Sequence, residues 1–163
     1  MKATGGMFRI AASGLMVVFL AGCALTIRDS EMSITNAPPA NSQAILITVE
    51  TPVPNIQGDQ YTLLVALRKE FTASGYRVES GGLILRATIT RLHRGNNMLN
   101  LLLQLGLGSD VIDVRVEVSD TNGTSYMTFL VRGEVLDKRY AEMSEVIRGI
   151  ATRIAADIKQ ASQ

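Results

Sequence analysis

Two residue types that carry much of protein chemistry occur only once each in this chain of 163 residues, as Cys23 and His93. A histidine can act as a general base or bind a metal. A base needs a nucleophile or an acid partner nearby, and a zinc site needs three or four ligands. With one histidine and one cysteine, neither set can be assembled from the usual residues. We therefore expect His93, which stands near Arg91 and Arg94, to be a surface residue, and we expect no metal site.

Asp110 and Asp113 are the two acidic residues that could be considered a pair of catalytic carboxylates. Residues three apart in a strand face opposite sides of a sheet, so we expect these two to be surface charges. Gly106-Leu107-Gly108 lacks the third glycine and the following helix of a dinucleotide-binding loop. Because no nucleophile and base can be paired, we expect the protein not to be an enzyme and to use no cofactor.

The chemistry open to Cys23 depends on the residues before it. Lys2 and Arg9 make the start of the chain positive, and residues 10–21 form an apolar run without a charge. The run is too short for a stable membrane span, which needs about 20 apolar residues. This layout is typical of an export signal.

Leu20-Ala21-Gly22-Cys23 resembles the lipobox of bacterial lipoproteins at every position. The resemblance implies that a diacylglycerol is attached to Cys23, that the signal is cleaved between Gly22 and Cys23, and that the new amino group is acylated. Many such proteins are retained at the inner membrane by an aspartate after the cysteine, and here Ala24 follows it. The resemblance therefore implies a lipid-anchored protein on the periplasmic face of the outer membrane.

Cleavage would also change the charge of the chain. It would remove two of the 16 Lys and Arg residues and none of the 15 Asp and Glu residues, which leaves a formal net charge of −1. A mature chain with no basic excess does not attract phosphate backbones, which argues against nucleic acid as a partner. No second cysteine exists, so no disulfide supports the fold.

The pattern divides the chain into a signal peptide over residues 1–22, a lipidated tether over 23–43 and a single domain over 44–163. The tether is expected because residues 24–43 are polar and contain a Pro-Pro pair. About 20 flexible residues have a typical end-to-end distance near 25 Å, enough to let a domain stand off a bilayer.

In the first half of the domain, apolar and polar residues alternate in segments that predict strands on either side of one helix. Apolar residues at every second position predict strands over 45–49 and 83–92, with a further strand segment over 76–79. Between them we expect a helix over 60–74, with Asp59 as its N-cap and Gly75 as its C-terminal stop.

A hairpin is the clearest local pattern. Residues 112–119 alternate, and Asn122-Gly123 predicts a two-residue type I′ turn. Opposing residue numbers then sum to about 245 for a loop of that length, so that Val118 faces Met127 and Asp113 meets Arg132 as a cross-strand charge pair.

The chain closes with an expected helix over 140–160, whose isoleucines recur at steps of three and four. The order of elements predicts an α+β fold, a two-layer sandwich of a mainly antiparallel sheet with both helices on one face. Its other face carries threonines and charges and can face water.

The domain also resembles the YajG-like group of small, uncharacterised Gram-negative lipoproteins. The resemblance runs from Leu63-Leu64 and Gly75-Tyr76 through residues 85–95 and the 120–124 turn to the alanine-rich last helix. It implies an envelope location and this fold, and it contains no catalytic motif.

One segment fits neither strand nor helix periodicity. Six leucines lie between two expected strands, with no charge before Asp110: Leu99, Leu101, Leu102, Leu103, Leu105 and Leu107. They form either a short helix or hairpin end packed on the domain, or an apolar surface for a partner or lipid. We expect a non-catalytic binding or assembly module at the outer membrane with an envelope protein partner. The alternative is an auxiliary subunit of an envelope transport or secretion complex.

Overall fold

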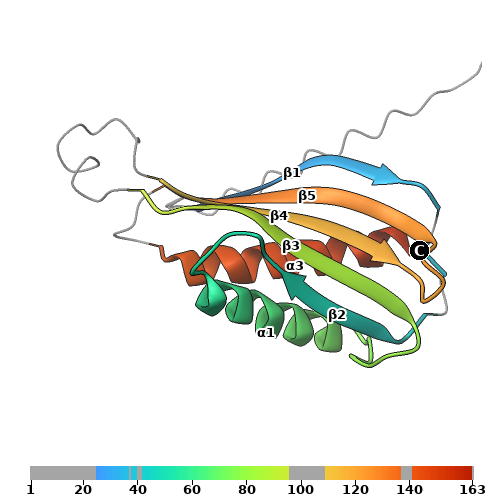
Figure 1. Cartoon of the computed structure of the whole chain (residues 1–163). Helices are drawn as coiled ribbons and strands as arrows, with labels where there is room; N and C mark the ends of the chain where they lie inside the picture. The colour runs from blue at the N-terminus through green and yellow to red at the C-terminus, as the bar shows by residue number, and fades with distance from the viewer. Residues whose placement is uncertain (1–24, 37, 40–41, 96–108, 137–140, 163) are drawn as a thin grey trace, which may run out of the picture.

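The computed structural model describes residues 25–36, 38–39, 42–95, 109–136 and 141–162, with only the backbone of residues 29–31. One five-stranded sheet carries two helices on one of its faces, which confirms the expected α+β fold (Figure 1). The elements in chain order are β1 Leu25–Ile34, β2 Ile45–Glu50, α1 Gln57–Ala73, β3 Leu83–His93, β4 Asp110–Ser119, β5 Ser125–Val135 and α3 Met143–Ala161.

The strands lie in the order β1-β5-β4-β3-β2. Neighbouring strands are antiparallel except β2 and β3, which run parallel and are connected through α1. Residues 76–79 form no full strand, but the Arg77 amide donates to the Gln43 carbonyl at 2.7 Å and the Glu79 amide to the Ile45 carbonyl at 3.1 Å. This segment therefore covers part of the outer edge of β2.

Strand β1 lies where the sequence predicted a flexible tether. Leu25 pairs with Val135 and Ile27 with Gly133, so most of the segment before Asn36 is the edge strand of the sheet. A Cβ at Gly149 of α3 would overlap Cδ1 of Ile27, so helix and strand are in close contact there. The expectation of a flexible tether over 23–43 is therefore wrong for Leu25–Ile34. A long-range pairing with β5 and a close contact with α3 hold the segment, and its local composition does not reveal either.

Helix α1 begins earlier than expected, and Asp59 is not its cap. The helix starts at Gln57, which places Asp59 in its first turn. Its end confirms the role of Gly75, whose φ is 93°. The amide of Tyr76 donates to the Phe71 carbonyl at 3.0 Å, and the rings of these two residues meet edge to face. This is the bonding of a Schellman motif with its apolar contact.

The register of the β4–β5 hairpin is confirmed. Val118 pairs with Met127 and Asp113 with Arg132. The turn itself differs from the type I′ expectation, because Gly123 has a positive φ of 84° and Asn122 does not. The Asp120 carboxylate accepts the amides of Asn122 and Thr124 at 2.9 and 2.8 Å, which favours a type I turn. A shift in pairing after Val118 restores the predicted register.

The same two amides affect the acidity of Asp120. Hydrogen bonds from the backbone of Thr124 and then of Asn122 hold the pKa of the Asp120 carboxyl below its usual value. The carboxylate is therefore the form that this turn requires.

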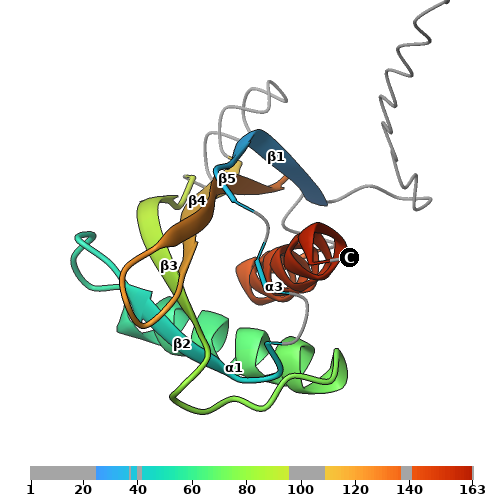
Figure 2. The same cartoon turned by 90° about the vertical axis from the view of Figure 1, so that its right-hand side faces the viewer.

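Helix α3 lies in the hollow of the curved sheet, between β1 and α1 (Figure 2). It starts at Met143, after a capping box in which Glu142 and Glu145 accept each other's backbone amides. The inner sheet face and the two helices enclose one core, whose largest buried side chains are Phe71, Phe129, Ile45, Leu63, Leu67, Leu83, Leu85, Ile89, Ile112, Met127, Ile147 and Ile150.

Candidate interaction surface

The face of the sheet turned away from the helices carries a row of charged side chains across four strands. The register aligns Arg28 of β1, Arg132 of β5, Asp113 of β4 and Arg91 of β3. Their neighbours along the strands, such as Ile112 and Val114, point into the core. Alternation therefore places all four charged residues on the open face.

Asp113 and Arg132 form the centre of this row. Arg132 donates from Nε to Oδ1 of Asp113 at 2.7 Å and from a terminal nitrogen to Oδ2 at 2.9 Å. These hydrogen bonds, and then the attraction of the carboxylate charge, raise the pKa of Arg132 above its usual value. The pair confirms the predicted cross-strand contact. The expectation that Asp113 is a surface charge is wrong, because it is only 6% exposed.

The two members of this pair differ in burial, which predicts unequal costs of removing them. The Arg132 side chain is 47% exposed and the Asp113 side chain 8%. Arg132→Ala leaves a buried carboxylate without its partner, and we expect it to cost about 3 kcal/mol of folding free energy. Asp113→Ala leaves a guanidinium that water can reach, and we expect a loss of about 1 kcal/mol. Urea unfolding of both variants would measure the difference, and equal losses would contradict it.

A β-bulge in β3 shapes the row at its other end. Ile89 pairs with Val114 and Arg91 with Asp113, so Thr90 is an extra residue in β3. Both Thr90 and Arg91 are exposed. Bulges turn side chains out of the regular alternation, and this one turns two adjacent polar residues toward solvent near Asp113.

On the half of this face that lies nearer the β4–β5 turn, the positive charge of arginine is matched by acidic side chains. Arg86 lies 3.4 Å from a carboxylate oxygen of Glu50 and 3.9 Å from one of Glu117. One cation is thus shared between two acids, each on a neighbouring strand. The surplus of arginine is confined to the half of the face near the start of β1.

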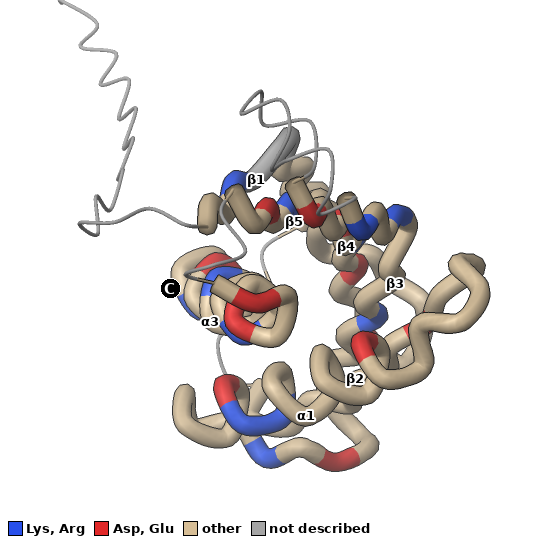
Figure 3. The backbone as a smooth tube through the Cα atoms, turned by 90° about the vertical axis from the view of Figure 1, so that its left-hand side faces the viewer, with Lys and Arg blue, Asp and Glu red and all other residues tan. Residues whose placement is uncertain are grey.

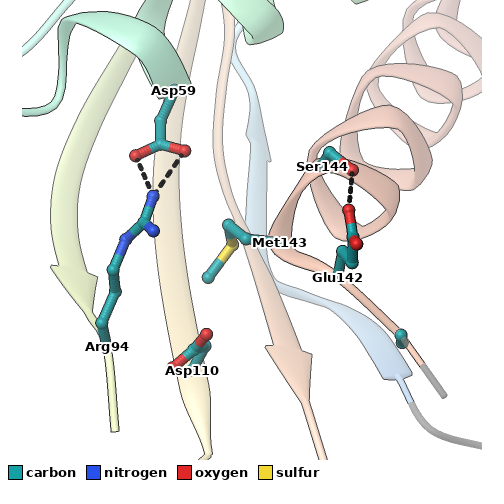
Figure 4. A pocket seen from close by; sticks show the side chains of 7 residues that line it. Asp59, Arg94, Asp110, Glu142, Met143 and Ser144 are labelled. Carbon is teal, nitrogen blue, oxygen red and sulfur yellow. Dashed lines mark hydrogen bonds and ion pairs between the residues drawn. The ribbon is translucent and has the colours of Figure 1, made fainter. Parts of the chain in front are cut away.

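A shallow pocket of about 360 Å³ lies between the first turns of the two helices (Figure 4). One terminal nitrogen of Arg94 lies 3.0 and 2.7 Å from the two carboxylate oxygens of Asp59. Asp110 accepts the Gly95 amide at 2.7 Å. These contacts link the end of β3 to α1 and to the start of β4. They give the polar groups of the pocket a structural role.

The sequence also singled out His93 and Asp110 as candidates for chemistry. His93 is exposed at the end of β3, as expected, and it does not line the pocket. Asp110 faces the helix side, opposite to Asp113 as expected, but it is buried at 8% exposure, so its assignment as a surface charge is wrong. In the part of the chain that the structure describes, no group of three acidic, histidine or cysteine side chains could hold a metal ion.

Gly22, Cys23 and the six leucines between Leu99 and Leu107 lie outside the described residues. The structure does place the residues that flank them. Leu25 pairs with Val135, and Val135 pairs with Asp110, so the start of β1 and the start of β4 lie at one end of the sheet. Within the described ranges, neither helix is long and apolar enough to cross a membrane.

Sequence comparison finds no match for this chain, either among protein-family profiles or among curated proteins. Its fold does match solved structures. The PelC dodecamer from Paraburkholderia phytofirmans aligns with a TM-score of 0.57 at 11% identity, over 83% of this chain and 97% of its own. This chain shares the fold of PelC.

A PelC variant dodecamer in a second space group aligns at 13% identity over the same shares of the two chains, with a TM-score of 0.51. A minor lipoprotein from Acinetobacter baumannii aligns at 17% identity over 75% of this chain and 94% of its own, with a TM-score of 0.45. At these identities the likeness to PelC concerns the arrangement of strands and helices.

The sequence alone does not reveal the row of charged side chains, called the arginine row below, because it depends on strand β1. Leu25 and Ile27 alternate with Thr26 and Arg28, which is a weak strand pattern of four residues. The polar residues that follow hide it. Only the pairing of β1 with β5 brings Arg28 beside Arg132.

Proposed function

We propose that this chain is a lipid-anchored envelope protein, and that its domain is a non-catalytic binding or assembly module on the periplasmic face of the outer membrane. The observation that carries the proposal is the position of Cys23. It ends a segment that resembles a lipobox and stands two residues before β1 in the sequence. A lipid at that cysteine would hold the folded domain close to the bilayer without an intervening linker.

The finer parts of the proposal come from the sequence. Ala24 in place of aspartate favours the outer membrane, and the resemblance to YajG-like lipoproteins favours the same envelope location. The polar groups of the pocket between the helices have partners: Arg94 bonds to Asp59, Asp110 accepts the Gly95 amide, and Ser144 donates to Glu142 at 3.5 Å. The proposed role is binding, without a cofactor.

Two observations support assembly as part of this role. PelC, which has the same fold, is a dodecamer. In this chain Tyr61 is 68% exposed and Val65 46% exposed, one turn apart on the outer side of α1. Large apolar side chains that lie together on a surface are typical of protein contacts.

Membrane fractionation followed by crosslinking in intact cells tests the proposal. We expect the chain in the outer-membrane fraction, crosslinked to copies of itself or to another envelope protein. One obligate foreign partner would favour an auxiliary subunit of a transport or secretion complex. Recovery as an uncrosslinked chain in the soluble fraction would contradict the proposal.

A further inference from the structure

We propose that the basic half of the open sheet face binds anionic lipid headgroups of the membrane that carries the anchor. This basic half consists of Arg28, Arg91, Arg115 and Arg132 with their neighbours Asp113 and Glu134. The inference rests on the proposed anchoring at Cys23, because the anchor is what brings this face to a membrane. It adds a second, electrostatic contact that orients the domain.

The arrangement of the arginines suits a flat anionic surface. Arg28, Arg132 and Arg91 lie in one register row that spans β1, β5, β4 and β3. Three interstrand steps of about 4.8 Å give this row a width of roughly 14 Å. In Figure 3, which views the sheet from the end where β1 starts, Lys and Arg segments occur along the sheet from β1 to β3.

The charges of this half are not balanced within the described part of the molecule. Arg132 binds Asp113 through two hydrogen bonds. The negative charge of Glu134 also raises the pKa of Arg132. Arg28, Arg91 and Arg115 form no ion pair with any described residue. The basic half thus contains four arginines and two acids. In the other half, Arg86 forms ion pairs with both Glu50 and Glu117.

The anchor lies next to the basic half and not the balanced one. Cys23 precedes Leu25 by two residues, which reach at most about 7 Å. Arg28 follows Leu25 by three residues of strand, about 10 Å farther along. The headgroup layer is several ångströms thick on each side of the bilayer. Arg28 therefore lies within about 17 Å of the residue that would carry the lipid, so a domain that rests with its open face on the bilayer brings its arginines to the lipid phosphates.

The net charge of the mature chain argues for a local site. A chain with a formal net charge of −1 is not attracted as a whole to an anionic surface. Attraction must come from a segregated patch, and a patch oriented by the anchor meets the lipid surface first. This favours headgroups over a soluble acidic polymer.

The unlipidated chain from Ala24 contains every described element and separates this contact from the anchor. We would measure its binding to vesicles of phosphatidylglycerol and phosphatidylcholine in equal parts, and to phosphatidylcholine alone. A basic residue near an anionic surface contributes about fivefold in affinity, so Arg28→Gln with Arg91→Gln should weaken binding about 25-fold. Arg68→Gln with Lys69→Gln removes two exposed cations from α1 and should leave binding unchanged.

Binding that needs phosphatidylglycerol and falls only in the sheet-face variant would support the inference. Equal loss in the α1 variant, equal binding to phosphatidylcholine alone, or binding to soluble alginate without vesicle binding would overturn it. Circular dichroism melting checks that both variants remain folded. A failure here leaves lipid labelling of Cys23 untouched, whereas an unlabelled Cys23 overturns the anchor whatever the vesicles show.

Discussion

Replacing Cys23 with serine is expected to leave an uncleaved precursor that incorporates no labelled palmitate. The lipobox resemblance implies that the thiol of Cys23 carries the diacylglycerol, and a serine hydroxyl cannot form that thioether. A single acyl chain holds a protein only marginally, at about 0.8 kcal/mol per buried methylene, and two or three chains hold it nearly permanently. Loss of the lipid therefore removes the anchor. Palmitate labelling and the size of the chain on a gel measure both effects.

Ala24→Asp is the matched control for that experiment. It keeps Cys23, so the chain should still be labelled and cleaved, but it supplies the residue that retains many lipoproteins at the inner membrane. We expect a change in membrane fraction without a change in label. A Cys23→Ser chain that still matures and stays on the outer membrane would show that the anchor is elsewhere.

Gly133→Leu is expected to destabilise the domain by at least about 3 kcal/mol. Gly133 lies in β5 beneath α3, and a Cβ there would overlap Cγ1 of Val146 and lie 2.9 Å from Cδ1 of Ile150. Both contacts belong to fully buried side chains of α3, so the helix must move away from the sheet. Gly133→Ala meets the same first contact and should cost about 2 kcal/mol.

Urea unfolding of the chain from Ala24 measures these losses, with two comparisons. A Cβ at Gly58 meets nothing within 4 Å, so Gly58→Ala should change stability by no more than about 0.5 kcal/mol. Val146→Ala should recover part of the loss of Gly133→Ala, since it removes the overlapping methyl group. A Gly133→Leu chain as stable as wild type would mean that α3 does not pack closely on β5.

The sequence by itself determined the elements whose pattern is local. Strict alternation over 112–119 and the turn residues after it predicted the hairpin register that places Asp113 opposite Arg132. Gly75 predicted the end of α1, because a positive φ at that point suits glycine and a Schellman motif. These predictions succeeded because each pattern and its structural consequence lie within a few residues of each other.

Only the tertiary structure decided how the ends of the chain and the charged residues are used. Strand β1 forms because Leu25 and Ile27 reach the last strand of the sheet, more than a hundred residues away in the sequence. Asp113 is buried although it lies on the open face of the sheet, and Arg132 of the neighbouring strand pairs with it. A local sequence period does not predict a contact between distant segments. The arginine row therefore follows only from the pairing of the strands in the sheet.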